Sequence, residues 1–380
     1  MGDNMKKTSK FKIDKNILLC IIAFFLISIF SINSAQKLLP DYLDNLVFKQ
    51  ILWYGLGFLI AFFIMYIGND YIYKHVWFLY GTGILLLIAL LIFAEPINNA
   101  KCWFSIPGIG VFQPSEFMKI ILIITIGTLI HNFNEKYPNP NIKEEFLFLL
   151  KIGLVVLIPS ILTFLQPDTG VVLIYLVITI IMLFISGIRY RWFILLFALS
   201  FVLIAIILLI YFLNSNLFVD IFGTSFFLRI DRLLDWSSSS GYQLENGLAA
   251  IGSGGIIGHG FNNTPIYFPE PQTDFIFAVY ANNTGFIGTI LLLSLFAFFD
   301  IKLILLATKT NSNINKYIIG GIIGMLIYQQ FQNIGMTIGL MPITGITLPF
   351  ISYGGSSLLS YMIMLGIIFN VSNEILRYKN

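Results

Sequence analysis

The chain has 380 residues, of which 57% are hydrophobic and 11% are charged. Soluble domains are about 45–50% apolar and about one quarter charged, so this composition excludes a water-soluble enzyme and indicates a membrane protein. A net charge of +3 is too small to indicate a partner made of nucleic acid. The two cysteines, Cys20 in an apolar run and Cys102 in a polar one, indicate neither a disulfide framework nor a paired metal-ligand motif.

Apolar windows long enough to cross a bilayer recur along the whole chain. A hydrocarbon core of about 30 Å requires roughly 20 apolar residues in a helix. We therefore expect an all-α polytopic membrane protein with ten transmembrane helices. The first window has no small-residue cleavage site after it, so we expect it to remain as a signal anchor. The windows are 16–33, 50–68, 75–94, 115–131, 147–166, 169–187, 192–214, 274–299, 316–336 and 352–372.

Lysine and arginine residues set the expected orientation. If the loops alternate from a cytoplasmic N-terminal tail, residues 1–15, then 16 of the 22 Lys and Arg residues fall on the cytoplasmic side. Because cytoplasmic loops carry an excess of these residues, we expect both termini to be cytoplasmic.

The long polar stretches then fall on the outer side. They are 95–114, 215–273 and 337–351, all rich in Gly, Pro, Ser and Asn, and the largest lies between the seventh and eighth helices. Long irregular connections usually carry function, so we expect the chemistry on the outer face. No repeat or linker divides the chain, so residues 1–380 are expected to form one integral membrane domain.

Glu116 and Lys119 stand out because ionisable groups are expensive at membrane depth. Pro114 and Ser115 indicate a helix start, which places Glu116 and Lys119 three residues apart on one helical face. One interpretation is a pair that neutralises itself. The other is a cation that faces an outer cavity and binds phosphate.

Two aspartates begin predicted helices. Asp168, in a Gln-Pro-Asp-Thr-Gly turn, could cap the next helix or partner a buried cation such as Lys119. Asp274 follows Pro269 and Pro271 at the end of the largest outer loop. It could cap its helix, or partial burial could raise its pKa into the range of a general base. By position, Asp274 is the strongest catalytic candidate.

Two glycine-rich stretches, 251–260 and 352–357, resemble phosphate-binding loops only superficially, because no Walker or dinucleotide pattern accompanies them. In membrane proteins, glycines more often allow close helix approach or a re-entrant turn. The three histidines, His75, His131 and His259, are too scattered to predict a metal site.

Seven strings together resemble the SEDS family, the bacterial proteins of shape, elongation, division and sporulation, and they occur in family order over nearly the whole chain. They start at Ala100 (AKCWF), Gln113 (QPSEFMK), Gln166 (QPDTG), Gly241 (GYQ), Ala250 (AIGSGG), Pro269 (PEPQTDFIF) and Leu348 (LPFISYGGSS).

This resemblance implies ten transmembrane helices and a peptidoglycan glycosyltransferase of the bacterial cytoplasmic membrane. The enzyme would join lipid II units at its active face, which would point outward. Its partner would be a class B penicillin-binding protein. The short termini favour the elongation branch, typified by RodA, over the division branch, and so imply contact with cell-wall elongation proteins as well as membrane lipids.

The resemblance also implies roles for individual residues. It makes Asp274 the essential acidic residue and Trp103 the essential loop tryptophan. Glu116, Lys119 and Asp168 match the buried charged positions of the family. In the resulting hypothesis, Asp274 takes the proton of an acceptor sugar hydroxyl. Cations offset the leaving pyrophosphate, and a divalent ion, Mg²⁺ or Mn²⁺, is left open as a helper. The candidate cations are Lys101, Lys119, Arg229 and Arg232.

Two other functions stay open at this point: a lipid II flippase, and a non-catalytic scaffold for a penicillin-binding protein. A flippase needs polar access on both faces, whereas the polar stretches here gather on one. Five positions at three places in the chain depart from the family pattern. Asn282-Asn283 replace two acidic residues, Glu245-Asn246 replace a Gln-Ser pair, and Asn99 replaces a glycine.

Overall fold

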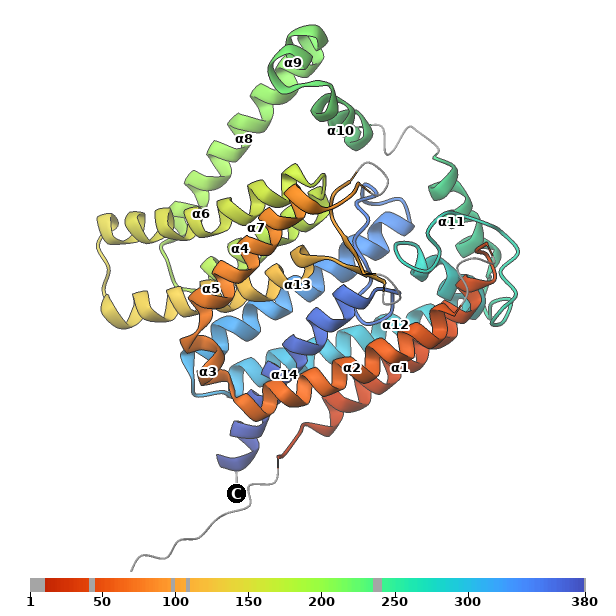
Figure 1. Ribbon diagram of the computed structural model, residues 1–380, viewed down its shortest axis with the longest axis horizontal. Helices are drawn as coiled ribbons and strands as arrows, with labels where there is room; N and C mark the ends of the chain where they lie inside the picture. The colour runs from red at the N-terminus through yellow and green to blue at the C-terminus, as the bar shows by residue number, and fades with distance from the viewer. Residues whose placement is uncertain (1–10, 41–44, 97–99, 107–109, 235–240, 379–380) are drawn as a thin grey trace, which may run out of the picture.

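The computed structural model describes residues 11–40, 45–96, 100–106, 110–234 and 241–378 (Figure 1). Within this part of the chain, ten helices coincide with the ten predicted windows. They are α1 (Lys15–Gln36), α2 (Leu46–Ile67), α4 (Val76–Phe93), α5 (Pro114–Lys136), α6 (Ile142–Leu165), α7 (Thr169–Ile185), α8 (Tyr190–Leu213), α12 (Ile276–Lys309), α13 (Asn313–Thr337) and α14 (Gly355–Tyr378).

The predicted membrane character is confirmed at the level of a mostly helical, multi-pass protein. Eight of the described helices are long and apolar enough to cross a bilayer, namely α1, α2, α4, α5, α6, α8, α12 and α14. Helix α7 has only 17 residues. Helix α13 has 25 residues but carries several Gln and Asn side chains. Ten crossings therefore stay a prediction.

Two of the outer stretches are more regular than expected. Residues 95–114 include an antiparallel hairpin of β1 (Phe104–Ile106) and β2 (Gly110–Phe112). The expectation of an irregular 215–273 loop is wrong, because it contains α9 (Ser215–Phe222), α10 (Thr224–Leu234) and α11 (Tyr242–Ser253). In α9 and α10 the aromatic rings recur at helical spacing and pack together: the ring centroids of Phe218 and Phe222 lie 4.8 Å apart. The remaining short helix is α3 (Asn69–Lys74).

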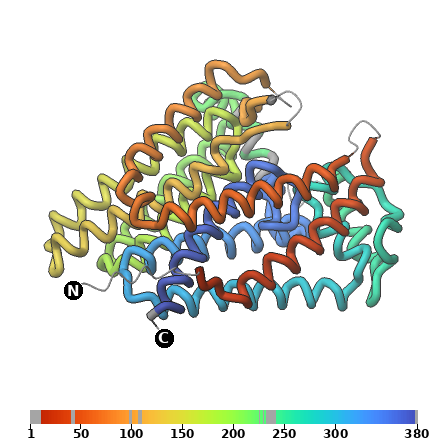
Figure 2. The backbone as a smooth tube through the Cα atoms, turned by 60° about the horizontal axis from the view of Figure 1, so that its bottom comes forward, coloured from red at the N-terminus to blue at the C-terminus, as the bar shows by residue number. Residues whose placement is uncertain are grey.

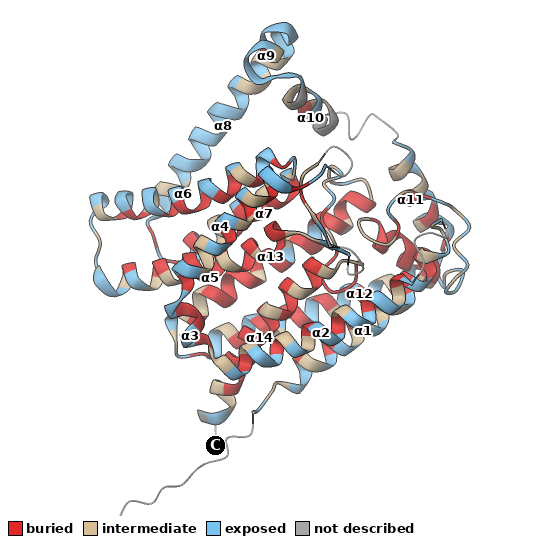
Figure 3. Ribbon diagram, in the orientation of Figure 1, coloured by how far each residue is buried: buried red, intermediate tan, exposed pale blue. Residues whose placement is uncertain are grey.

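The helices form a bundle whose centre is α5, α13 and α14. Helix α14 packs along α2, while α13 packs against α5, α7 and α12. Figure 3 shows the buried residues concentrated in these elements. Helix α8 is the contrast: none of its residues is buried, and in Figure 1 it rises away from the bundle and carries α9 and α10 at its far end. Its apolar surface is what a lipid-exposed helix requires.

The beginning of α1 and the end of α14 lie at the same end of the bundle (Figure 2). A direct hydrogen bond joins them, from the backbone N–H of Lys12 to Asn373 Oδ1 at 3.0 Å. The described chain therefore begins and ends at the same end of the bundle.

Helix α12 is broken where the glycine stretch 251–260 meets it. Gly285 has φ 65° and ψ −164°, which interrupts the helical hydrogen bonds. The loop supplies replacements: the N–H of His259 donates to Asn282 O at 3.0 Å, and the N–H of Phe286 donates to Gly255 O at 2.9 Å. Buried backbone groups need partners at membrane depth. This glycine stretch therefore serves close backbone approach, as expected for glycines in membrane proteins.

Candidate functional site

The first turn of α5 carries the predicted ion pair. Pro114 occupies the first helical turn, where its missing N–H costs nothing. Lys119 Nζ lies 2.7 Å from Glu116 Oε2, and Lys119 is fully buried. The ammonium group also lies 5.5 Å from the ring centroid of Tyr361. The self-neutralising interpretation of this pair is therefore confirmed, and Glu116 stands between Lys119 and open space.

Asp168 joins two helices and a loop. Its Oδ1 accepts from the N–H of Val171 at 3.2 Å, so it caps α7, as one interpretation predicted. Its Oδ2 accepts from Gln113 Nε2 at 2.8 Å, and Gln113 Oε1 accepts from Trp103 Nε1 at 3.1 Å. Gln113 is thus held between a carboxylate and an indole, and its orientation fixes Trp103. Burial raises the pKa of Asp168 to about 6, and the charge of Glu116 adds to this.

Asp274 lies just before α12 and does not cap it. The residue that precedes the helix is Phe275, and it makes no side-chain cap. Asn333, fully buried on α13, donates from Nδ2 to the backbone oxygens of Asp274 at 2.9 Å and Ile346 at 2.7 Å. Within the described residues, no hydrogen bond reaches the Asp274 carboxylate, which faces Gly345. This carboxylate is therefore free for a ligand.

The pKa of Asp274 is raised to about 7, first by burial and second by the negative charge of Glu270. Glu270 has φ 52° and accepts hydrogen bonds from Gln272 and Thr273. A carboxyl group with a pKa near neutrality can exchange a proton with substrate under working conditions, as a general base must.

One cavity of about 560 Å³ collects these groups. Trp103, Glu116, Asp168 and Asp274, each predicted from a different motif, all line it. Further lining comes from the start of α14, at Gly354, Gly355, Ser356 and Ser357, and from residues that the sequence did not single out. The latter include Trp53, Gln329 and Thr347, while Gln113, Glu270 and Tyr353 come from the family-like motifs without having been predicted as site residues.

Neither Lys101 nor Lys119, the two predicted cations whose side chains the structure describes, lines this cavity. No Lys or Arg is found among its described lining residues, whereas four carboxylates are. Lys119 lies behind Glu116, and Lys101 Nζ donates to Leu91 O at 3.3 Å. Arg229 and Arg232 belong to α10, and their side chains lie outside the described part of the structure. The described cavity wall is therefore electronegative.

The question of a metal ion has a partial answer. In the described ranges, no three His, Cys, Asp or Glu side chains group closely enough to hold a metal ion. The four carboxylates of the cavity are thus distributed around it and do not converge on one point.

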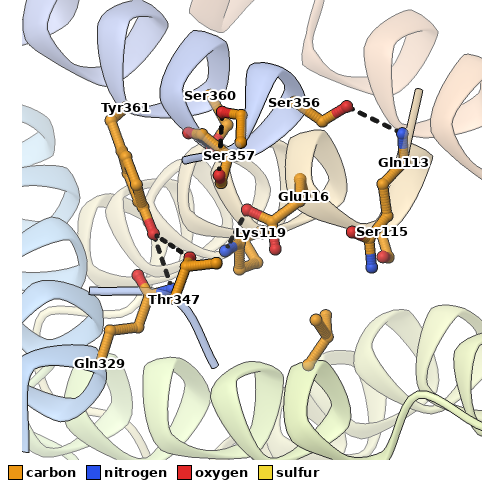
Figure 4. Close-up of polar contacts among 12 residues, drawn as sticks. Gln113, Ser115, Glu116, Lys119, Gln329, Thr347, Ser356, Ser357, Ser360 and Tyr361 are labelled. Atoms are coloured by element: carbon orange, nitrogen blue, oxygen red, sulfur yellow. Dashed lines mark hydrogen bonds and ion pairs between the residues drawn. The ribbon is translucent and has the colours of Figure 1, made fainter. Parts of the chain in front are cut away.

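The polar contacts behind the cavity wall tie α5, α13 and α14 together (Figure 4). Glu116 and Lys119 lie between Tyr361 on one side and Gln113 on the other. Gln329 Nε2 donates to the Tyr361 hydroxyl at 2.9 Å, and Ser356 Oγ accepts from the N–H of Gln113 at 2.9 Å. We name this the cavity cluster: Gln113, Glu116, Lys119, Gln329 and Tyr361.

The departures from the family pattern have structural partners. Asn282 Nδ2 donates to Ala250 O at 2.8 Å and to Ser253 Oγ at 2.9 Å. Asn283 Oδ1 accepts from Thr264 Oγ1 at 3.1 Å. Both asparagines therefore form hydrogen bonds to the segment, residues 250–264, that contacts the break in α12. Asn99 lies outside the described residues.

Comparisons with known proteins identify the family of this chain. The family model of FtsW, RodA and SpoVE, described as cell cycle protein, matches residues 13–376. The stage V sporulation protein E of Bacillus subtilis is 32% identical, covering 97% of this chain and 98% of its own length. A probable peptidoglycan glycosyltransferase FtsW of Coxiella burnetii is 30% identical, over 97% and 98%.

Solved structures share the fold. A chain from a structure of coordinated polymerization and crosslinking by a peptidoglycan synthase complex superposes with a TM-score of 0.77 at 27% identity, covering 98% of this chain and 100% of that one. The crystal structure of the rod shape determining protein RodA of Thermus thermophilus gives a TM-score of 0.67 at 26% identity, over 94% and 96%.

Proposed function

The chain belongs to the FtsW, RodA and SpoVE family, and we propose that it is a peptidoglycan glycosyltransferase that polymerises lipid II. The observation that carries this proposal is the cavity itself. It brings the unpaired carboxylate of Asp274 together with Trp103, Asp168 and Glu116, and each of these comes from a separate part of the chain.

In the proposed reaction, Asp274 acts as the general base. It accepts the proton of the acceptor sugar's 4-hydroxyl as that oxygen attacks the anomeric carbon of the donor. The bond between this carbon and the pyrophosphate breaks, the configuration inverts, and the polyprenyl pyrophosphate leaves. Geometry and pKa both support this role, because the Asp274 carboxylate has no described partner and its pKa is raised to about 7. Trp103, fixed by Gln113, would pack on a sugar face.

The pyrophosphate needs a different partner from the one expected. Lys119 is fully buried behind Glu116, so its role becomes that of a counter-charge that keeps Glu116 in place. We place the pyrophosphate at the start of α14, because Gly355, Ser356 and Ser357 line the cavity there and a helix N-terminus offers free backbone N–H groups to an anion. Lys101, Arg229, Arg232 and a divalent ion remain candidates for further charge compensation.

The proposed topology has ten crossings, cytoplasmic termini, and the cavity open to the outer face of the bacterial cytoplasmic membrane as one domain. Support comes from the distribution of Lys and Arg and from the hydrogen bond between Lys12 and Asn373. By similarity to the synthase complex, the proposed partner is a class B penicillin-binding protein transpeptidase. An elongation role, with other elongation proteins as partners, is part of the same proposal.

The test is direct. The purified chain is incubated with labelled lipid II, with and without its penicillin-binding partner, and the products are separated by length. Glycan polymer is expected. If neither condition gives polymer but labelled lipid crosses vesicle membranes, the flippase function is the correct one. If neither polymer nor lipid movement is found, the scaffold function is the correct one.

A further inference from the structure

Gln329 has an unusual position in the cavity wall. It is 1% exposed, its Nε2 donates to the Tyr361 hydroxyl at 2.9 Å, and its Oε1 has no hydrogen-bond partner. Of the described residues that line the cavity, it alone carries a buried side-chain nitrogen or oxygen without a partner. A buried acceptor of this kind usually has a reason, because leaving it unpaired costs about 1–3 kcal/mol.

Glu116 offers a second acceptor nearby. Its Oε2 accepts from Lys119, and no described residue donates to its Oε1. Gln329 is linked to Glu116 only indirectly: Gln329 donates to the Tyr361 hydroxyl, and Lys119, the partner of Glu116, lies 5.5 Å from the Tyr361 ring centroid (Figure 4). The neighbouring hydroxyls of Ser356 and Ser357 donate to the backbone oxygens of Val111 and Gly354. Glu116 and Gln329 therefore each have an oxygen that can accept a further hydrogen bond.

We propose that Gln329 and Glu116 form a subsite that binds hydrogen-bond donors of a substrate sugar ring, its hydroxyl and acetamido N–H groups, and does not bind the pyrophosphate. This inference rests on the proposed function and assigns one part of the substrate to one part of the cavity. A pyrophosphate offers acceptors and negative charge, so it would meet the oxygens of Gln329 and Glu116 with repulsion. A sugar offers several donors.

Aromatic rings in the same cavity suit a sugar as well. Trp53, Trp103 and Tyr353 line it. Gly355 allows Trp53 to approach the start of α14, since a Cβ atom at this glycine would lie 2.7 Å from Trp53 Cε2. Rings held against backbone offer flat apolar faces, while the acceptors supply the directional contacts that select the ligand.

The experiment compares two ligands that differ only in the sugar. Binding of a disaccharide-bearing polyprenyl pyrophosphate and of the sugar-free polyprenyl pyrophosphate is measured on the detergent-purified full chain. Gln329→Met keeps the side-chain length and the Glu116–Lys119 pair but removes the acceptor. We expect it to bind the disaccharide ligand about tenfold more weakly, as one lost hydrogen bond predicts, and the sugar-free ligand within about twofold of wild type.

Two controls separate recognition from structure. Gln330→Met makes the same substitution one residue along α13, where the side chain donates to Asp300 and does not line the cavity. Tyr361→Phe removes the hydroxyl that accepts from Gln329 Nε2 and leaves Oε1 in place. Both controls are expected to bind the two ligands within about twofold of wild type.

Three results would overturn the proposed subsite. Gln329→Met could bind the disaccharide ligand as tightly as wild type, or it could bind both ligands equally more weakly. Alternatively, Tyr361→Phe could lose as much affinity for the disaccharide ligand as Gln329→Met does. Because binding is measured without transfer, these results stand apart from a failure of the proposed function. A chain that makes no polymer but loses sugar-dependent binding in Gln329→Met would refute the transferase and support the subsite.

Discussion

Two buried polar clusters tie the helices of this protein together, and they differ in what they leave unpaired. The cavity cluster lies at the start of α5 and contains Gln329 with its unpartnered oxygen. The other, which we name the terminal cluster, lies near the end of α14 that adjoins the start of α1. Its members are Asn69, Tyr73, Asn315, Asn370 and Glu374.

The terminal cluster is closed. Asn370 Nδ2 donates to Asn69 Oδ1 at 2.9 Å, and Asn69 Nδ2 donates to Ile367 O at 3.1 Å. Tyr73 donates to Asn315 Oδ1 at 2.9 Å. Among these described side chains, no buried nitrogen or oxygen lacks a partner, and none of them lines the described cavity. A network whose task is to hold helices together satisfies its members, because each unpaired group would subtract from stability.

The cavity cluster departs from that rule at Gln329, whose buried Oε1 has no described partner. Its hydrogen bonds to Gln113, Ser356 and Tyr361 are complete on the protein side. Gln329 and Glu116, which carry the spare acceptors, both line the cavity. If Gln329 contacts a ligand, as proposed, then substitutions in the cavity cluster and in the terminal cluster should have different effects.

The largest expected effect is on activity alone. Asp274→Asn preserves size and removes the base, so we expect the polymerisation rate to fall by about 10²–10⁴-fold with little change in melting temperature. The matched control is Asp300→Asn, which alters a buried carboxylate of α12 that does not line the cavity. Full polymerisation by purified Asp274→Asn would remove this residue from the mechanism.

The terminal cluster should show the opposite behaviour. Asn69→Leu leaves Asn370 Nδ2 without one acceptor and removes the side-chain donor of Ile367 O. We expect a loss of about 1–3 kcal/mol in unfolding free energy, seen as a lower melting temperature in detergent. The kcat/KM of the folded fraction should be unchanged. A large fall in kcat/KM with unaltered melting temperature would erase the distinction between the clusters.

The pH dependence of the reaction tests the base independently of substitution. Since the pKa of Asp274 is raised to about 7, chiefly by burial, the carboxyl is protonated below that pH and cannot accept a proton. We expect kcat/KM to rise about tenfold per pH unit up to about pH 7 and then to level. A profile that stays flat from pH 5 to pH 8 would contradict the assignment.

The same division explains how much of the molecule could be predicted. The ten helices could be predicted from apolar windows, because a helix that crosses a membrane needs a continuous run of about 20 apolar residues whatever their spacing. The prediction for α12 ended at residue 299, while the helix continues to Lys309, because Asp300 and Lys302 lower the local hydropathy without breaking the helix. The break at Gly285 was not predicted, since it depends on backbone partners from a distant loop.

Within the site, the sequence predicted which segments of the chain contribute residues. It did not predict which side of a helix faces the cavity. Glu116, Asp168 and Asp274 were predicted because charged or polar motifs interrupt apolar runs, whereas Trp103 was predicted only from the resemblance to the family. All four line the cavity. Gln329 lies inside the apolar run 316–336 beside other glutamines, and only the packing of α13 decides which one faces the cavity. In the same way, the three-residue spacing predicted the partner of Lys119 but not its full burial.

The smallest expected effect refines the pH profile. Glu270 is the second cause of the raised Asp274 pKa, after burial, because its negative charge disfavours ionisation of its neighbour. Glu270→Gln removes that charge but keeps an acceptor oxygen for Gln272 and Thr273. The pKa of Asp274 should therefore fall, and the rising limb of kcat/KM should move to lower pH by less than about one unit. The plateau rate should stay close to wild type, since the base itself is intact. A limb that moves to higher pH would show that Glu270 acts on Asp274 through the loop conformation and not through its charge.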